Sequence, residues 1–260
     1  MQNFLLVPNG ELVVFGDPKQ NVYQRPLDAN GDIRLGIIGG QWNRQLTTSR
    51  RFTNPRLANL ATAFQTQFMA NLPTDDIVAE NTISNTFNFQ IVTYIDLRQN
   101  NSIESIITNI INIISNDNNE ARDFAVLASS TKLLRNIDIL YRQRTNEQTE
   151  ITFISNETLE RLKQIHQVTD EKAANWKFNR DFEALERTRK QLFTTDKRCL
   201  KISTIQSFKG WESPSVIVIL ENDIVLHNTT FRPMSPQTIY TAITLSLIHI
   251  SEPTRLALIS

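Results

Sequence analysis

Two short polar stretches carry the residues of this chain that are best suited to chemistry. The first, Gly16-Asp17-Pro18-Lys19-Gln20, directly follows the apolar run "LVVF", which predicts a buried strand. Residues at the carboxyl ends of parallel strands line the ligand crevice of an α/β sheet. Gly16 permits a tight turn, and the amide of Gln20 can both donate and accept hydrogen bonds. Taken alone, however, Gly-Asp-Pro is better explained as a surface turn.

The second stretch is "ISTIQSFKGWESPSVIVIL", in which a Gly-containing loop lies between two predicted strands. The side chains of Thr204, Gln206 and Ser207 can contact the phosphate backbone of a nucleic acid without reading its bases. Lys209 and Gly210 suit the close approach of an anion. An ordinary polar connection explains the same residues about equally well.

Cysteine and histidine provide no further site. The chain has one cysteine, Cys199, and three scattered histidines, His166, His227 and His249. A single cysteine allows no intrachain disulfide, and no spacing of these residues is typical of zinc. We therefore expect no metal site, and we expect Cys199 to be a small core residue.

Four stretches, taken together and in their order, resemble the motifs of UvrD/Rep-like superfamily 1 helicases. "VVFGDPKQNVY" resembles motif III (GDxxQ-x-I-Y), and "LTTSRRF" (46–52) resembles motif IV. "TIQSFKGWESPSVIVI" resembles motif V (T-x-H-x-x-K-G-L-E), and "IYTAIT" resembles the opening of motif VI. The resemblance spans residues from about 4 to 244.

The resemblance implies an ATP site, with Mg²⁺ in the complete protein. By this likeness Gln20 senses the γ-phosphate and couples it to DNA, and Arg51 reaches the same phosphate. Arg50 stands where a tyrosine usually stacks on the adenine, and a guanidinium can also stack. Gly210 and Glu212 match the part of motif V near the nucleotide.

The resemblance also implies single-stranded DNA as the partner. Tyr23 matches an aromatic residue beside the DNA, where stacking tolerates any base. Thr204, Gln206, Ser207 and Lys209 match the part of motif V that touches the DNA backbone. The sequence departs from the usual motif V in three ways: Gln206 replaces a histidine, Trp211 replaces a leucine, and Ser213-Pro214 replaces Phe-Pro.

The elements that would position these residues alternate along the chain. Helical spacing of apolar residues predicts helices over about 55–68, 102–116 and 131–143, and apolar runs predict strands over 11–17, 87–97, 123–130, 150–155, 199–208 and 213–223. This alternation predicts an α/β fold with a parallel sheet and crossover helices. The charged segment 157–193 has little apolar stripe and predicts a projecting helical segment.

The resemblance extends this to a RecA-like, P-loop NTPase-type fold. Residues 1–45 would end a first motor domain, and residues 46–244 would form the second, with a helical insertion at about 157–197. Residues 245–260 are identical to the translation of a common transposase sequencing adapter, so we expect them to be non-native.

The expected parent is an ATP-dependent DNA helicase that moves 3′ to 5′. The chain itself has no G-x-x-x-x-G-K-[ST] loop, and Leu245 stands where motif VI continues towards its arginine finger. Such an arginine contributes about 10³–10⁵ in rate in other nucleotide hydrolases. We therefore expect this chain to be a catalytically incomplete fragment. Two alternatives remain open: a related RNA motor, or a non-catalytic binding module.

Composition limits the environment and the partners. Lys+Arg and Asp+Glu both number 27, and this zero net charge argues against a protein that simply coats DNA. The first residues, "MQNFLLVPNGELVVFG", lack the basic region and cleavage site of a signal peptide. No run approaches the ~18 apolar residues of a membrane span. We expect a cytoplasmic protein without a membrane partner; its oligomeric state stays open.

Overall fold

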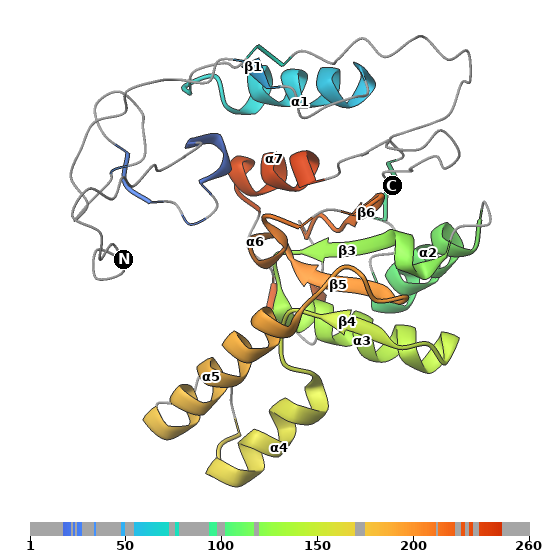
Figure 1. Ribbon diagram of the computed structural model, residues 1–260, viewed down its shortest axis with the longest axis vertical. Helices are drawn as coiled ribbons and strands as arrows, with labels where there is room; N and C mark the ends of the chain where they lie inside the picture. The colour runs from blue at the N-terminus through green and yellow to red at the C-terminus, as the bar shows by residue number, and fades with distance from the viewer. Residues whose placement is uncertain are drawn as a thin grey trace, which may run out of the picture.

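A four-stranded, all-parallel sheet lies at the centre of the computed structural model (Figure 1). The structure describes residues 18–21, 23, 25–27, 34, 48–49, 55–72, 76–77, 94–97, 102–116, 120–169, 175–211, 213–221, 225–226, 229–230 and 234–245. The strand order is β4-β5-β3-β6, formed by β3 (Phe124–Ala128), β4 (Thr149–Ile151), β5 (Leu200–Thr204) and β6 (Ser215–Val218). The prediction of an α/β fold with a parallel sheet is therefore confirmed.

The register of the sheet places β3 between two partners. Val126 of β3 pairs with Ile202 of β5 on one side and with Ile217 of β6 on the other. All five residues of β3 are buried. A strand covered on both faces is typical of a parallel sheet whose crossover helices pack on both sides.

Two helical layers cover the two faces of this sheet. Helices α2 (Ile103–Ser115) and α3 (Thr131–Thr145) pack on the face to which Phe124, Val126 and Ala128 point. On the other face, α6 (Ile205–Phe208) and α7 (Pro236–Leu245) pack against Ala125 and Leu127. Alternation of side chains along β3 thus divides the interior into two apolar clusters.

Serine caps fix where several helices begin. The hydroxyl of Ser102 accepts a hydrogen bond from the Ser105 N–H at the start of α2, and Ser130 does the same for Leu133 in α3. Such a cap satisfies a backbone donor that the first helical turn leaves without an intrahelical partner. The predicted cap at Ser102 is confirmed, as are the helices at 55–68 and 131–143; the first of these is α1 (Pro55–Phe68).

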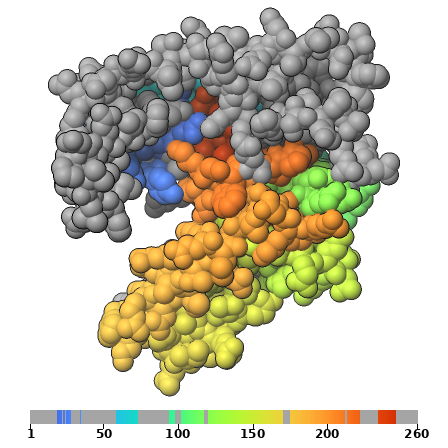
Figure 2. Space-filling model, in the orientation of Figure 1, coloured from blue at the N-terminus to red at the C-terminus, as the bar shows by residue number. Residues whose placement is uncertain are grey.

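The predicted insertion is a helical hairpin that projects from the sheet (Figures 1 and 2). It consists of α4 (Asn156–His166) and α5 (Trp176–Leu192). The expectation of a projecting helical segment with little apolar stripe is confirmed, but the sequence did not predict that its few apolar residues form a core. Leu159 and Leu162 of α4 and Phe178 of α5 are buried together with Ile154 in a small cluster of their own. These few apolar residues sufficed because two helices need only a narrow seam to pair.

Three predicted strands also differ from the structure. The strand predicted at 150–155 begins at Thr149 and already ends at Ile151. The strand predicted at 199–208 ends at Thr204, because Thr204 caps the short helix α6 and the chain turns there. Residues 94–97, the described end of the strand predicted at 87–97, have no regular secondary structure. The strand predicted at 11–17 lies outside the described residues.

Short elements complete the described chain. They are the 3₁₀ turns η2 (Pro18–Gln20) and η5 (Ala121–Asp123), the parallel pair β1 (Thr48–Ser49) and β2 (Asp76–Ile77), and the antiparallel pair β7 (Val225–Leu226) and β8 (Thr229–Thr230). No helix among the described residues is long and apolar enough to cross a membrane.

Candidate nucleotide and nucleic-acid interface

The loop after β5 holds the predicted nucleic-acid residues in a compact turn. Ile205 and Phe208 of α6 are fully buried, and this anchors the turn to the core. The Thr204 hydroxyl accepts a hydrogen bond from the Ser207 N–H at 3.2 Å. Gln206 is half-buried beside them. The turn therefore presents short polar side chains at the carboxyl end of a central strand, where α/β proteins bind ligands.

Lys209 and Gly210 form the exposed end of this turn. Gly210 has φ +96°, a backbone conformation that residues with a Cβ rarely adopt. The Trp211 N–H donates to the Phe208 carbonyl at 2.9 Å and closes the turn. The sharp reversal places the Lys209 side chain in solvent, where an ammonium group can meet an anion.

The two polar stretches that stand out in the sequence meet in space. The Lys209 Nζ donates a hydrogen bond to the backbone carbonyl of Gln20 at 3.3 Å, although the two residues are 189 positions apart. Gln20 ends η2, whose helical turn packs against α7; Figure 1 shows this blue segment beside α7. Residues from the motif III-like, motif V-like and motif VI-like stretches are thus neighbours.

Tyr23 is a surface residue and follows Gln20 by three positions in the sequence. Its side chain is 64% exposed, and the Arg25 guanidinium carbon lies 6.0 Å from the ring centroid. The Asn21 side chain fixes the turn between them, since it accepts from the Arg25 N–H and donates to the Arg25 carbonyl. An exposed ring beside a cation is an arrangement that suits stacking on a nucleic-acid base.

Three predicted site residues lie outside the described residues: Arg50, Arg51 and Glu212. The expected convergence of Gln20 and Arg51 on one phosphate therefore stays a prediction. Among the residues that the structure does describe, no group of three or more histidine, cysteine, aspartate or glutamate side chains could hold a metal ion.

Helix α7 underlies the candidate interface. Tyr240, Thr241 and Thr244 are buried, and the Tyr240 hydroxyl accepts a hydrogen bond from Gln65 Nε2 of α1 at 2.5 Å. Leu245, where the non-native tail was expected to begin, is the last residue of α7 and is buried. Residues 246–260 lie outside the described part of the chain.

Glu221 is a residue of this sheet edge that the sequence reasoning missed. It lies three residues beyond β6 and is only 2% exposed. Its Oε1 accepts hydrogen bonds from the backbone N–H groups of Ser129 (2.5 Å) and Ser130 (2.6 Å). Burial raises the pKa of Glu221, and the two backbone donors oppose that shift. An acidic residue directly after a buried apolar run was the signal in the sequence.

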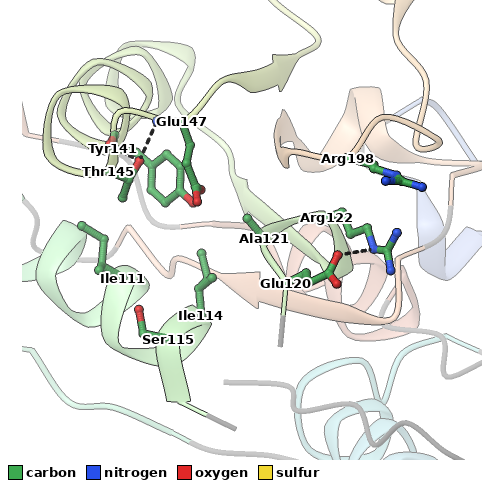
Figure 3. Close-up of a pocket in the computed structure, with 10 residues that line it drawn as sticks. All are labelled: Ile111, Ile114, Ser115, Glu120, Ala121, Arg122, Tyr141, Thr145, Glu147 and Arg198. Carbon is green, nitrogen blue, oxygen red and sulfur yellow. Dashed lines mark hydrogen bonds and ion pairs between the residues drawn. The ribbon is translucent and has the colours of Figure 1, made fainter. Parts of the chain in front are cut away.

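A pocket of about 410 Å³ lies elsewhere, at the amino ends of the strands (Figure 3). Its wall includes Tyr141, whose hydroxyl donates to Glu147 at 2.5 Å, and Arg122, which pairs with Glu120 at 2.7 Å. Arg122 and Glu120 form an ion pair, and Glu147 and Arg198 add one charge of each sign to the wall. The pocket lies at the amino ends of the strands, whereas Lys209 follows the carboxyl end of β5 and contacts Gln20. The pocket therefore does not belong to the candidate interface.

Comparison with known proteins does not identify a family for this chain. No model of a protein family matches the chain, and no curated protein matches it either.

Proposed function

We propose that this chain is part of an ATP-driven motor that moves on single-stranded DNA, with 3′ to 5′ polarity, as in the UvrD/Rep-like superfamily 1 helicases. The hydrogen bond from Lys209 to the Gln20 carbonyl is the observation that carries the proposal. It joins two distant stretches that resemble motifs of one family, in a chain whose sheet is parallel. Chance resemblance of either stretch gives no reason for the two to meet.

The nucleotide half of the proposal concerns ATP bound with Mg²⁺ in the complete protein, with metal ligands that this chain would not itself supply. Gln20 would contact the γ-phosphate through its amide, and Arg51 would pair with the same phosphate from the second motor domain. Arg50 would stack on the base, while Gly210 lets the backbone approach the nucleotide and Glu212 lies nearby. Two cleft walls that close around a triphosphate couple its hydrolysis to movement.

The nucleic-acid half of the proposal rests on side chains suited to contact the sugar-phosphate backbone of a nucleic acid and not the edges of its bases. Thr204, Gln206 and Ser207 are polar and uncharged, and Lys209 supplies one positive charge. Tyr23 is exposed enough to stack on a base of any kind. Contacts of this type bind without sequence preference, as a translocating motor requires.

Binding of labelled oligothymidine by the 260-residue chain tests the nucleic-acid half. We expect salt-dependent binding, and we expect Lys209→Ala to weaken it and to reduce the slope of log K against log salt by about 0.7, the value of one lost phosphate contact. Lys177→Ala, at the start of α5 in the hairpin, is the matched control and should leave the slope unchanged. Equal effects of both variants, or no binding at all, would contradict the proposal.

The same assay separates the alternatives. Tighter binding of an RNA oligonucleotide of the same length would favour an RNA motor. Binding of neither nucleic acid would favour a module that only binds another partner.

ATP turnover tests the nucleotide half. The sequence has no G-x-x-x-x-G-K-[ST] loop, so we expect the purified chain to hydrolyse ATP no faster than a buffer control, with or without oligothymidine. Steady turnover by this chain would show that its phosphate chemistry uses other residues than those proposed.

A further inference from the structure

The pocket at the amino ends of the strands combines an apolar wall with charged groups (Figure 3). Its volume of about 410 Å³ lies within the range of about 300–1,000 Å³ in which proteins hold small molecules. Ile111 and Ile114 of α2 and the ring of Tyr141 of α3 supply the apolar wall, and Tyr141 is only 1% exposed. The apolar part of a ligand can therefore be removed from water here.

Two of the four charged residues of the pocket already neutralise each other. The Arg122 Nε lies 2.7 Å from the Glu120 carboxylate, so this pair has little charge left for a ligand. Glu147 and Arg198 are the other two, and both side chains are exposed. Among the residues that the structure describes, no ion pair involves either of them. The pocket thus offers a ligand one negative and one positive group.

The carboxylate of Glu147 is held in place without losing its charge. The Tyr141 hydroxyl donates to it at 2.5 Å, and the Glu147 N–H donates to the Thr145 hydroxyl oxygen at 3.3 Å. Burial raises the pKa of Tyr141, so the hydroxyl stays protonated and neutral. A carboxylate that is already fixed loses less conformational entropy when it accepts a further hydrogen bond from a ligand.

Arg198 supplies the positive group from another part of the wall. It lies two residues before β5, and Figure 3 shows it apart from Tyr141 and Glu147. A guanidinium group presents planar donors that match both oxygens of a carboxylate. The two free charges are therefore arranged to bind two opposite charges of one ligand, with the apolar wall beside them.

We propose that this pocket binds a zwitterionic ligand with an apolar body, whose ammonium group contacts Glu147 and whose carboxylate contacts Arg198. Free apolar amino acids and short apolar peptides share this chemistry. A ligand with a single charge would leave Glu147 or Arg198 without a partner. The site is separate from the candidate interface, so the inference goes beyond the proposed function and does not depend on it.

Titration of the isotope-labelled chain with leucyl-leucine, followed by the amide resonances of residues 111–115 and 141–147, tests this inference. We expect these resonances to shift. N-acetyl-leucyl-leucine lacks the ammonium group and leucyl-leucinamide lacks the carboxylate. Each should bind about two- to fivefold more weakly, the effect of one exposed ion pair. Free leucine distinguishes the two sources: tighter binding than leucyl-leucine assigns the site to an amino acid, and weaker binding assigns it to a peptide.

Two variants at exposed positions assign each end of the ligand. Arg198→Ala should bind leucyl-leucine and leucyl-leucinamide equally, and Glu147→Gln should bind leucyl-leucine and its N-acetyl form equally. Arg189→Ala, which removes an exposed arginine of α5, is the control and should bind as the wild type does.

Three results would overturn the inference. The first is the absence of binding at about 10 mM ligand, tenfold above the dissociation constant of about 1 mM of a weak ligand. The second is equal binding of leucyl-leucine and both blocked analogues by the wild type. The third is an equal loss of binding in Arg198→Ala and Arg189→Ala.

Discussion

Burial decides the different roles of the two charged residues at the carboxyl edge of the sheet. Glu221 is almost completely buried, so its carboxylate must be satisfied by backbone donors, and it acts within the protein. Lys209 is exposed, and its ammonium group can meet a ligand as well as the Gln20 carbonyl. A charge that is kept in water costs little, whereas a buried charge persists only with fixed partners.

The pH dependence of stability should report on Glu221. Its folded-state pKa is raised above the ordinary value of 4.5 by burial, so the folded protein holds the proton more tightly than the unfolded chain. This contribution to stability is complete below about pH 4.5 and is lost as the pH rises through the folded-state pKa. Urea unfolding at several pH values should therefore show a falling contribution in that window.

The variant Glu221→Gln removes this titration but keeps an oxygen that can accept from Ser129 and Ser130. We expect its free energy of unfolding to lose less than that of the wild type as the pH rises from about 4.5 to 7. Glu183→Gln, on the exposed face of α5, should keep the wild-type profile. Parallel profiles for all three proteins would show that Glu221 titrates normally.

At the scale of elements, α7 connects the candidate interface to the rest of the chain. It contacts η2 and α6 and pairs with α1 through the buried hydrogen bond from Gln65 to Tyr240. A double-mutant cycle of Gln65→Ala and Tyr240→Phe should give a coupling free energy of about 0.5–1.5 kcal/mol in chemical unfolding. Additive effects would mean that the α1–α7 contact is held by apolar packing alone.

The hairpin should behave as an element with a stability of its own. Its apolar cluster is separate from the two clusters of the sheet, and the buried Phe178 ring is its centre, with the Phe182 ring 5.8 Å away. Phe178→Ala should cost about 3–5 kcal/mol locally. Hydrogen exchange should then accelerate in α4 and α5 while β3 and β5 stay protected.

The matched control for this prediction is Leu185→Ala, on the same helix at a half-exposed position. It should leave exchange in the hairpin nearly unchanged. Loss of protection throughout the sheet in Phe178→Ala would show instead that the hairpin and the sheet unfold together.

At the scale of the whole molecule, the sheet separates and connects two apolar clusters, and we expect them to unfold as one cooperative unit. Residues of β3 belong to both clusters, because alternate side chains point to opposite faces. Leu133 of α3 is fully buried against one face. Leu133→Ala should cost about 2–5 kcal/mol and lower the Tm in a single transition that includes the helices on both faces. Two separate transitions, seen by calorimetry, would contradict this unity.

Much of this architecture was predictable from local patterns. The apolar runs at 123–130 and 213–223 correctly predict β3 and β6, and the isoleucine spacing at 102–116 correctly predicts α2. Side-chain periodicity is a property of neighbouring residues, so it is visible in one sequence. Where a cap competed with an apolar run, as at Thr204, the pattern gave the wrong end of the strand.

The candidate site was predictable only in its residue types. Gln206, Ser207 and Lys209 stand out because polar residues collect beside Gly210, but their partners do not follow from the sequence. Glu221 shows this limit clearly. In the sequence nothing distinguishes it from other acidic residues, and the backbone N–H groups that donate to it belong to residues 91 and 92 positions away.

The sequence by itself determined that this chain forms strands and helices in alternation and that these build a parallel sheet. Only the tertiary structure decided that Lys209 meets Gln20, that the hairpin has a core, and that Glu221 closes the turn before α3. The physical reason is the distance along the sequence over which each interaction acts. Periodicity and capping involve residues within one or two helical turns, whereas these contacts join distant segments that become neighbours only when the sheet assembles.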